Sequence, residues 1–448
     1  MLHLERAATS FPHLSRRTAL RVGFLGLGGL TLAQLSRLEA NQGSRRDKSV
    51  ILFFAHGGPS HLETYDLKPD APDDIRGPFS PIATRISGTR ICEHLPKQAR
   101  IAHRFTLLRS CSHDEADHFA GHRRFLSGYG QLKQGTGYES HYPQIGAAVN
   151  RVFSGSSRAM PPALAVGGVV VNGPDYAAGV SEGYWNSAFR VPIVNGGLRD
   201  VSLSVDAGRL EDRLALLQRF DSMRRNLDPA RTAEAMDAHQ QRALDVILSG
   251  RAREAFDLSR EDPRVREKYG PGYGQEALTA RRLVEAGVRF VTVRIPGGGP
   301  GTNAYDWDDH AVNWDMLAAM HARLPRYDHV VSTLIEDLHE RGLDQDVLLI
   351  VTGEFGRTPR LERQNDRIGR DHWPHAMSIL ISGGGMPMGQ VIGATDRQGG
   401  EPRERRFDPR DFLATIYHFL GIDPHMQFPD SSGRPIGLTD GTPLQELI

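Results

Sequence analysis

The chain has 448 residues, of which 39% are hydrophobic, enough for one large α/β domain or two ordinary ones. Lys plus Arg and Asp plus Glu both number 54, so the formal charge is zero and nothing in it favours nucleic acid or an anionic membrane as a partner. Only two cysteines occur, Cys92 and Cys111, which excludes a four-cysteine zinc site.

The N-terminus has the features of an export signal. Residues 15–20 (SRRTAL) resemble a twin-arginine signal, with Ala19 where the pattern usually has Phe, and an apolar, glycine-rich segment follows at 22–35. That segment is short for a bilayer span, so we expect no transmembrane anchor in the mature protein. The alternative is an amphipathic N-terminal helix. We predict that residues 1–40 address the chain to the twin-arginine export machinery, and that the mature protein is periplasmic or extracellular.

Short apolar runs predict strands, and longer segments with helical spacing predict helices. The predicted strands are 50–55, 104–109, 163–171, 288–293, 347–351 and 378–381. The predicted helices are 119–126, 275–286, 311–324, 325–341 and 409–420, with a helical pattern across 210–258 and a loop at 263–273. This alternation predicts an α/β fold with a doubly wound, mostly parallel central sheet and helices on both faces. We expect a single domain over 48–448, with a helical and loop insertion around 172–270.

Histidines and acids gather where several predicted strands end. Strand 50–55 leads into HGGPSH (56–61), whose glycines permit a close backbone approach to a ligand and which delivers His61. Gly-Gly-Pro is also an ordinary turn. Because ligands of open α/β sheets bind beyond the carboxyl ends of the strands, we expect these residues to lie near one another.

The exit of strand 104–109 offers candidates for catalysis. Ser112 lies among histidines just before a predicted helix, an arrangement that supplies a nucleophile with a base, although an ordinary N-cap is the alternative. His113, His118 and His122 form a dense group, and the last two share one helical face at i, i+4.

The loop after strand 288–293 contains DWDDH at 306–310. Three aspartates in four positions, with no lysine nearby, repel one another unless a cation binds or they stay well solvated. Asp308 and His310, or Asp306 and His310, have a spacing suited to one metal ion. The alternative is a series of N-cap residues for the helix that follows.

The segment between strands 347–351 and 378–381 is the richest in candidate ligands. Glu354 emerges where the first of these strands ends, and a polar, arginine-rich loop follows. The loop and its end supply further candidates, Arg357, Asp371, His372 and His375. Carboxylates and imidazoles are ligands for divalent metals. The alternative is a solvated loop whose acids pair with its own arginines.

Five segments, in this order, resemble a bacterial family catalogued as domain of unknown function 1501. They are GGPSH (57–61), YDLKPD (65–70), WDDH (307–310), TGEFGRTP (352–359) and GRDHWPHA (369–376). That family is similar to the alkaline phosphatase and sulfatase superfamily, which implies an alkaline phosphatase-like fold, bound metals at the C-terminal sheet edge and hydrolysis of phosphate or sulfate esters. Within this resemblance, Glu354-Phe355 stands where the superfamily has Asp-His, and His118 falls at the position of the nucleophile.

We therefore predict an exported metal-dependent hydrolase of a small-molecule or glycan ester of phosphate or sulfate. Its divalent cofactor would be Zn, Mn, Ca or Mg, with ligands drawn from His61, Asp308, His310, Glu354, Asp371, His372 and His375. His118 or Ser112 would attack or transfer protons with His113 nearby, and Arg357 would orient the anionic substrate. The alternative is a non-catalytic exported protein of the same fold that binds sulfated or phosphorylated glycans.

Overall fold

The computed structural model describes residues 47–130, 141–154, 160–168, 178–195, 197, 250–430 and 432–448. The chain divides into two compact units, residues 1–47 and residues 48–448, and the fold described below is that of the second unit. The predicted signal and most of the predicted insertion lie outside the described residues. Among the described helices, none combines the length and the hydropathy needed to cross a bilayer.

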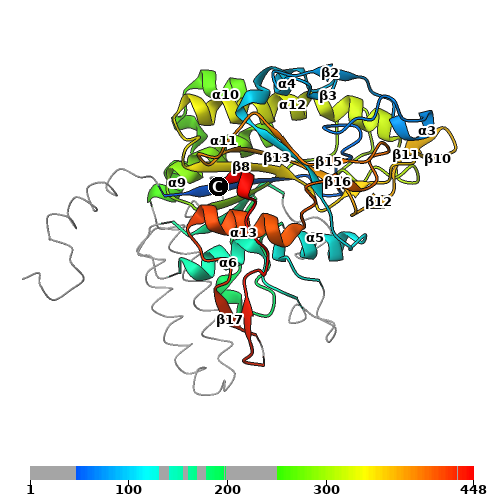
Figure 1. Cartoon of the computed structure of the whole chain (residues 1–448). Coiled ribbons are helices and arrows are strands. Elements are labelled where there is room, and N and C mark those ends of the chain that lie inside the picture. The colour runs from blue at the N-terminus through cyan, green and yellow to red at the C-terminus, as the bar shows by residue number, and fades with distance from the viewer. Residues whose placement is uncertain are drawn as a thin grey trace, which may run out of the picture. The chain divides into compact units, whose positions relative to one another are not determined.

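An eight-stranded sheet forms the centre of this unit (Figure 1). Its strand order is β14-β4-β13-β8-β1-β7-β5-β6. In chain order the strands are β1 (Ser49–Phe54), β4 (Thr106–Cys111), β5 (Ala163–Val166), β6 (Ile193–Val194), β7 (Phe290–Arg294), β8 (Val347–Thr352), β13 (Met377–Gly383) and β14 (Val391–Ile392). Neighbouring strands are parallel, except that β13 runs antiparallel to both β4 and β8. The predicted mostly parallel sheet is confirmed.

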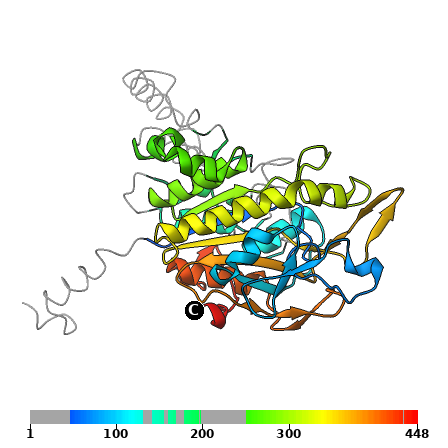
Figure 2. The same cartoon turned by 90° about the horizontal axis from the view of Figure 1, so that it is seen from above.

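Helices cover both faces of the sheet (Figures 1 and 2). Alternate residues of β1 show why: Ile51 and Phe53 join one hydrophobic core, and Leu52 joins the other. The first core includes α4 (Pro96–Ile101), α11 (Tyr273–Glu285) and α12 (Met316–Glu340). The second includes α5 (His118–Ser127), α6 (Ile145–Val152) and α13 (Pro409–Leu420). This two-sided cover confirms the predicted α/β class.

Shorter elements surround the sheet. In the described part of the chain, the other helices are α3 (Asp73–Arg76), α9 (Gly250–Phe256) and α10 (Pro263–Tyr269), with 3-10 turns η1 (Ala102–Arg104), η4 (Ser187–Phe189), η6 (Leu258–Arg260) and η7 (Gln445–Leu447). Paired short strands are β2 (Pro81–Ala83) with β3 (Arg90–Cys92), β9 (Gly356–Arg357) with β12 (His372–Trp373), β10 (Glu362–Gln364) with β11 (Arg367–Gly369), β15 (Ala394–Thr395) with β16 (Pro402–Glu404), and β17 (Gln427–Pro429) with β18 (Pro435–Gly437).

Two predicted boundaries are wrong. The predicted loop at 263–273 contains α10, which begins at Pro263 because the Asp262 side chain accepts the N–H of Arg264 and caps it. The two helices predicted on either side of Pro325 are one helix, α12, which begins only at Met316. Burial of the residues around Pro325 outweighs the single hydrogen bond that a proline removes.

The carboxyl ends of β1, β4, β7 and β8 meet at one edge of the sheet, where β13 begins. The loops at this edge approach one another closely at Gly57. Its φ is +107°, and a Cβ there would lie 2.5 Å from the backbone N of Asp308. Only glycine permits both this conformation and this approach, so Gly57 brings the loop after β1 against the loop after β7.

Candidate metal centre

Three histidines converge on one carboxylate oxygen at this sheet edge. Asp308 Oδ1 lies 3.1 Å from Nε2 of His118, 2.9 Å from Nε2 of His310 and 3.0 Å from Nε2 of His372. The Nε2 atoms of His310 and His372 are 2.9 Å apart. His118 begins α5, His372 begins β12, and the other two follow β7. Separate loops therefore deliver their side chains to a single point.

The opposite ring nitrogen, Nδ1, of each histidine faces an oxygen that accepts hydrogen bonds. For His118, His310 and His372 in turn, these oxygens are Glu354 Oε1 at 2.7 Å, Asp371 Oδ1 at 2.7 Å and the carbonyl of Ala116 at 2.6 Å. Nδ1–H donates in each case, so a neutral ring keeps its lone pair on Nε2. Three lone pairs and a carboxylate oxygen thus face one another. Histidines that bind a metal through one ring nitrogen usually donate the N–H of the other nitrogen to such an acceptor.

The spacing and the donor types also fit a metal ion. Ligand atoms held at roughly 2.0–2.1 Å from one ion lie about 2.9 Å apart in octahedral geometry and about 3.3 Å apart in tetrahedral geometry, and the distances around Asp308 Oδ1 are 2.9–3.1 Å. Three imidazoles with one carboxylate suit zinc or another transition metal, whereas calcium and magnesium prefer oxygen ligands. The residues present therefore fit a transition-metal ion.

Glu354 adds a buried negative charge beside this group. Its Oε1 accepts the N–H of Gly57 at 2.8 Å as well as the contact from His118, while Oε2 is buried without a hydrogen-bond partner among the described residues. His56, His118 and Glu354 bring one ligand atom each within 4.8 Å of one another. A buried carboxylate oxygen without a partner is costly, which a nearby cation relieves.

Protonation compensates these carboxylates in the metal-free protein. Burial opposes the charged form of His118, but hydrogen bonds to Asp308 and then Glu354 outweigh it and raise its pKa to about 9. Burial likewise favours neutral Glu354, yet the adjacent histidines, His56 first, lower its pKa to about 2. Burial is again outweighed at Asp308, where hydrogen bonds from three histidines lower the pKa well below its usual range. Both acids are ionised, and without a metal the protonated His118 ring donates to both, from Nδ1 to Glu354 and from Nε2 to Asp308.

Of the three clustered aspartates, only Asp308 joins this centre. Asp309 is fully buried and pairs with Arg323, and it also accepts the indole N–H of Trp314 at 2.9 Å. Asp306 lies 3.5 Å from Nδ1 of His56. The sequence pattern offered no nearby lysine, but Arg323 from α12 supplies the missing positive charge.

Two predicted site residues have different placements from those expected. Arg357 is fully buried and donates to the carbonyls of Gly57 and Gly58, and to Asp308 Oδ1 at 2.7 Å. It is therefore placed to hold Asp308, not to contact a substrate. Asp371, predicted as a ligand, has a side chain that is 61% exposed and holds Nδ1 of His310. It holds the His310 ring from the solvent side.

Four further candidates lie away from the Nε2 cluster. His61 is buried, with Nε2 2.8 Å from the carbonyl of Gly399. His113 is also buried, and its Nε2 donates to the carbonyl of Glu354 at 2.7 Å. His375 is exposed and stacks edgewise on Trp373. Ser112 accepts a hydrogen bond from Arg406.

The sequence places His56 at the tip of the first strand but does not single it out as a ligand. The register pairs Phe54 of β1 with Thr352 of β8, so His56 and Glu354 each stand two residues beyond paired positions. The pairing of these two strands was the signal needed, and it is not visible in the sequence alone.

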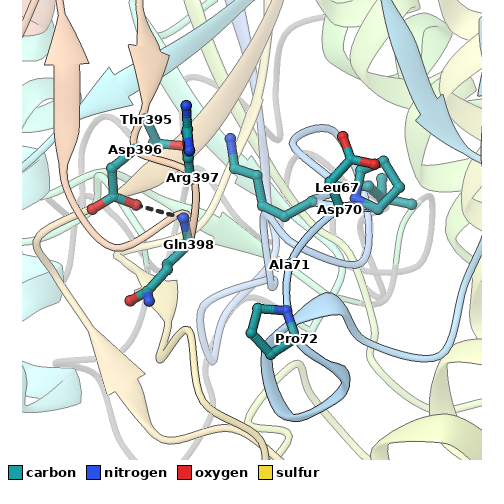
Figure 3. Close-up of a pocket in the computed structure, with 10 residues that line it drawn as sticks. Leu67, Asp70, Ala71, Pro72, Thr395, Asp396, Arg397 and Gln398 are labelled. Atoms are coloured by element: carbon teal, nitrogen blue, oxygen red, sulfur yellow. Dashed lines mark hydrogen bonds between the residues drawn. The ribbon is translucent and has the colours of Figure 1, made fainter.

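A cavity of about 730 Å³ opens between the loop 67–72 and the turn 395–398 (Figure 3). In this turn, Asp396 accepts the backbone N–H of Gln398 at 2.9 Å. Trp373, which follows His372, donates its indole N–H to the carbonyl of Gly400 at 2.6 Å. Gly400 lies two residues beyond the turn 395–398, so this hydrogen bond ties the chain just after the cavity-lining turn to the strand that carries His372.

Known proteins resemble this chain in different degrees. No curated protein matches it. Solved structures with some likeness include a phosphonate monoester hydrolase from Silicibacter pomeroyi (11% identity, 89% of this chain and 76% of that one, TM-score 0.39) and an alkaline phosphatase from the Antarctic bacterium TAB5 (12%, 85% and 99%, 0.37). A sulfatase from Pseudoalteromonas sp. is similar to the same degree (13%, 87% and 70%, 0.36). Residues 47–448 match the family described as "Protein of unknown function (DUF1501)", and the chain belongs to that family.

Proposed function

We propose that this protein is an exported, metal-dependent hydrolase of phosphate or sulfate esters. The observation that carries the proposal is the convergence of three histidine Nε2 atoms on Asp308 Oδ1, with each Nδ1 held by an acceptor. Residues 1–40, which hold the twin-arginine pattern, support the export part of the proposal.

The proposed ligands are Asp308, His118, His310 and His372, with Glu354 beside them. A transition-metal ion bound there would polarise an ester oxygen and lower the pKa of a coordinated water. The chain's own contribution is orientation: Asp371 and the carbonyl of Ala116 hold two of the rings. Arg357 holds Asp308 in place by donating a hydrogen bond to its Oδ1.

The attacking group in this proposal is water. Among the described residues, no hydrogen bond joins a Ser, Thr or Cys side chain to any of the four ligands. Both nitrogens of His118 face carboxylates, and Ser112 contacts Arg406 instead. A single displacement by water therefore suits these residues better than an ester formed on the chain.

We place the organic part of the substrate in the cavity of Figure 3. The cavity combines apolar residues, Leu67, Ala71 and Pro72, with the polar Asp70, Arg397 and Gln398. A saccharide or another polar organic group offers matching faces. The hydrogen bond from Trp373 to Gly400 supports this placement, because Gly400 lies two residues beyond the cavity-lining turn 395–398 and Trp373 belongs to β12, which begins with His372.

Turnover of aryl phosphate and aryl sulfate esters tests the proposal. The purified full chain is assayed with and without added Zn²⁺ or Mn²⁺, alongside His372→Ala and the control His418→Ala, which changes an exposed histidine of α13. We expect metal-dependent turnover that falls at least 100-fold in His372→Ala and stays within about threefold in His418→Ala. Metal binding with no turnover of either ester class, in any of these proteins, would contradict the hydrolase and favour a glycan-binding protein.

A further inference from the structure

We propose that a second pocket binds an oxyanion: a phosphate, a sulfate or a carboxylate. This Ser112 pocket is formed around Ser112, Arg406 and His375 and has a volume of about 440 Å³. It is separate from the Nε2 cluster and uses two residues, Ser112 and His375, that the metal centre leaves aside.

Backbone pairing sets Arg406 opposite Ser112. The N–H of Ser112 donates to the carbonyl of Phe407 at 3.0 Å, and the N–H of Phe407 donates to the carbonyl of Ser110 at 3.3 Å. The Arg406 side chain then reaches back, and its Nη2 donates to Ser112 Oγ at 3.1 Å. Ser112 is buried, so this hydrogen bond fixes its hydroxyl at the floor of the pocket.

The acids that line the pocket are engaged by other partners. Asp408 pairs with Arg410 and caps α13, where Asp411 completes the capping box. Asp114 pairs with Arg124 at 3.2 Å. Asp408 and Asp114 therefore have cationic partners other than Arg406, and Asp411 accepts the backbone N–H groups of Asp408 and Thr442.

The groups that remain available are donors. Arg406 forms no ion pair among the described residues and contacts only Ser112 through one nitrogen. The Ser112 hydroxyl accepts that bond and keeps its own O–H to donate, and the His375 ring is exposed. A guanidinium, a hydroxyl and an imidazole around one space match the acceptor oxygens of an oxyanion.

The pocket also shares its walls with the metal centre. The segment from Ser112 to His118 lines the pocket at its start and ends at a proposed ligand. The segment from His372 to His375 begins at a proposed ligand and ends in the lining of the pocket. The N–H of His113 donates to the carbonyl of Pro374 at 2.9 Å, so a hydrogen bond joins the two segments. An anion here would lie behind the loops that hold two ligand histidines. It is either a free anion or a second acidic group of the substrate.

Calorimetric titration of the purified full chain with inorganic phosphate, and separately with glucuronate, tests this site. We expect at least one of them to bind, and Arg406→Gln or Ser112→Ala to weaken that binding at least tenfold, since each removes a donor. Arg405→Gln is the matched control because Arg405 is adjacent but pairs with Glu446. It should stay within twofold of the parent chain.

The two ligands separate the sources of the anion. Phosphate binding points to a free anion, and binding of glucuronate alone points to an acidic group of a saccharide. No binding of either ligand, or equal affinity in Arg406→Gln, would overturn the proposal. The anion site does not depend on the metal, so His372→Ala should still bind the anion. Arg406→Gln should likewise keep its metal, so that a failure of the anion proposal can be told apart from a failure of the metal centre.

Discussion

The Nε2 atoms of His310 and His372 lie 2.9 Å apart, although Nδ1 of each ring already donates to an oxygen. Two neutral rings held in this way present lone pairs to each other, which is repulsive. A shared proton or a shared cation removes the repulsion. Since Asp308 and His118 meet at the same point, one bound cation would account for the placement of all four side chains.

Asp371 is expected to tune the affinity for the metal without being a ligand. Asp371→Asn weakens the acceptor for Nδ1–H of His310, so we expect the metal dissociation constant to rise about 10–100-fold, with the ion still bound at saturation. Competition with a chromogenic chelator measures this constant. Asp366→Asn, an exposed change in the neighbouring hairpin, is the control and should have no effect. Complete loss of metal in Asp371→Asn would make Asp371 a direct ligand.

Arg357 is expected to act on stability. A lysine there cannot satisfy the buried carbonyls of Gly58 and Arg370, so Arg357→Lys should lower the free energy of unfolding by about 3–5 kcal/mol. Urea denaturation measures the change. Arg360→Lys, where the side chain is 81% exposed, should change it by less than about 1 kcal/mol. A stable Arg357→Lys protein with only a raised KM would restore the substrate contact predicted from the sequence.

The metal-free protein should lose stability as the pH rises. The pKa of His118 is about 9 in the folded chain and about 6.5 in an unfolded one. Its contribution is therefore fully present below pH 6.5 and is lost as the pH rises through about 9. Thermal unfolding of chelator-treated protein between pH 6.5 and 9.5 should show Tm falling more steeply in the parent chain than in His118→Gln. Parallel curves would contradict this assignment.

Gly57 should tolerate no side chain. In Gly57→Ala the new Cβ would lie 2.5 Å from the backbone N of Asp308, at a φ of +107°. We expect a loss of about 3 kcal/mol or more in the free energy of unfolding, together with weaker metal binding. Gly301 also has a positive φ, +77°, but open space around its Cβ position, so Gly301→Ala should cost only about 1–2 kcal/mol. Equal losses in the two variants would contradict the role given to the close approach.

Local signals predicted the elements that local chemistry determines. Helix 409–420 was predicted with the bounds that α13 has, because Asp408 caps it, Pro409 begins it and Gly421 ends it. α12 was predicted as two helices because Pro325 normally ends a helix, and only the packing of the folded chain keeps it continuous. Where burial decides, the sequence pattern was insufficient.

The same division holds for the site. Asp308, His310, Glu354 and His372 were predicted because acids and imidazoles at strand ends share one sheet edge. The roles of Asp371 and Arg357 depend on which loops meet in the folded chain. The hydrogen bond between His310 and Asp371, for example, joins residues 61 positions apart. Such interactions are properties of the assembled loops.

The metal content of the purified chain tests the central claim most directly. After incubation with Zn²⁺ or Mn²⁺ and gel filtration, elemental analysis of the parent chain should find at least one transition-metal ion per chain. His372→Ala should lose it, whereas His375→Ala, three residues away and outside the Nε2 cluster, should keep it. A parent chain without metal, or equal metal in the two variants, would contradict the centre formed by Asp308 and the three histidines.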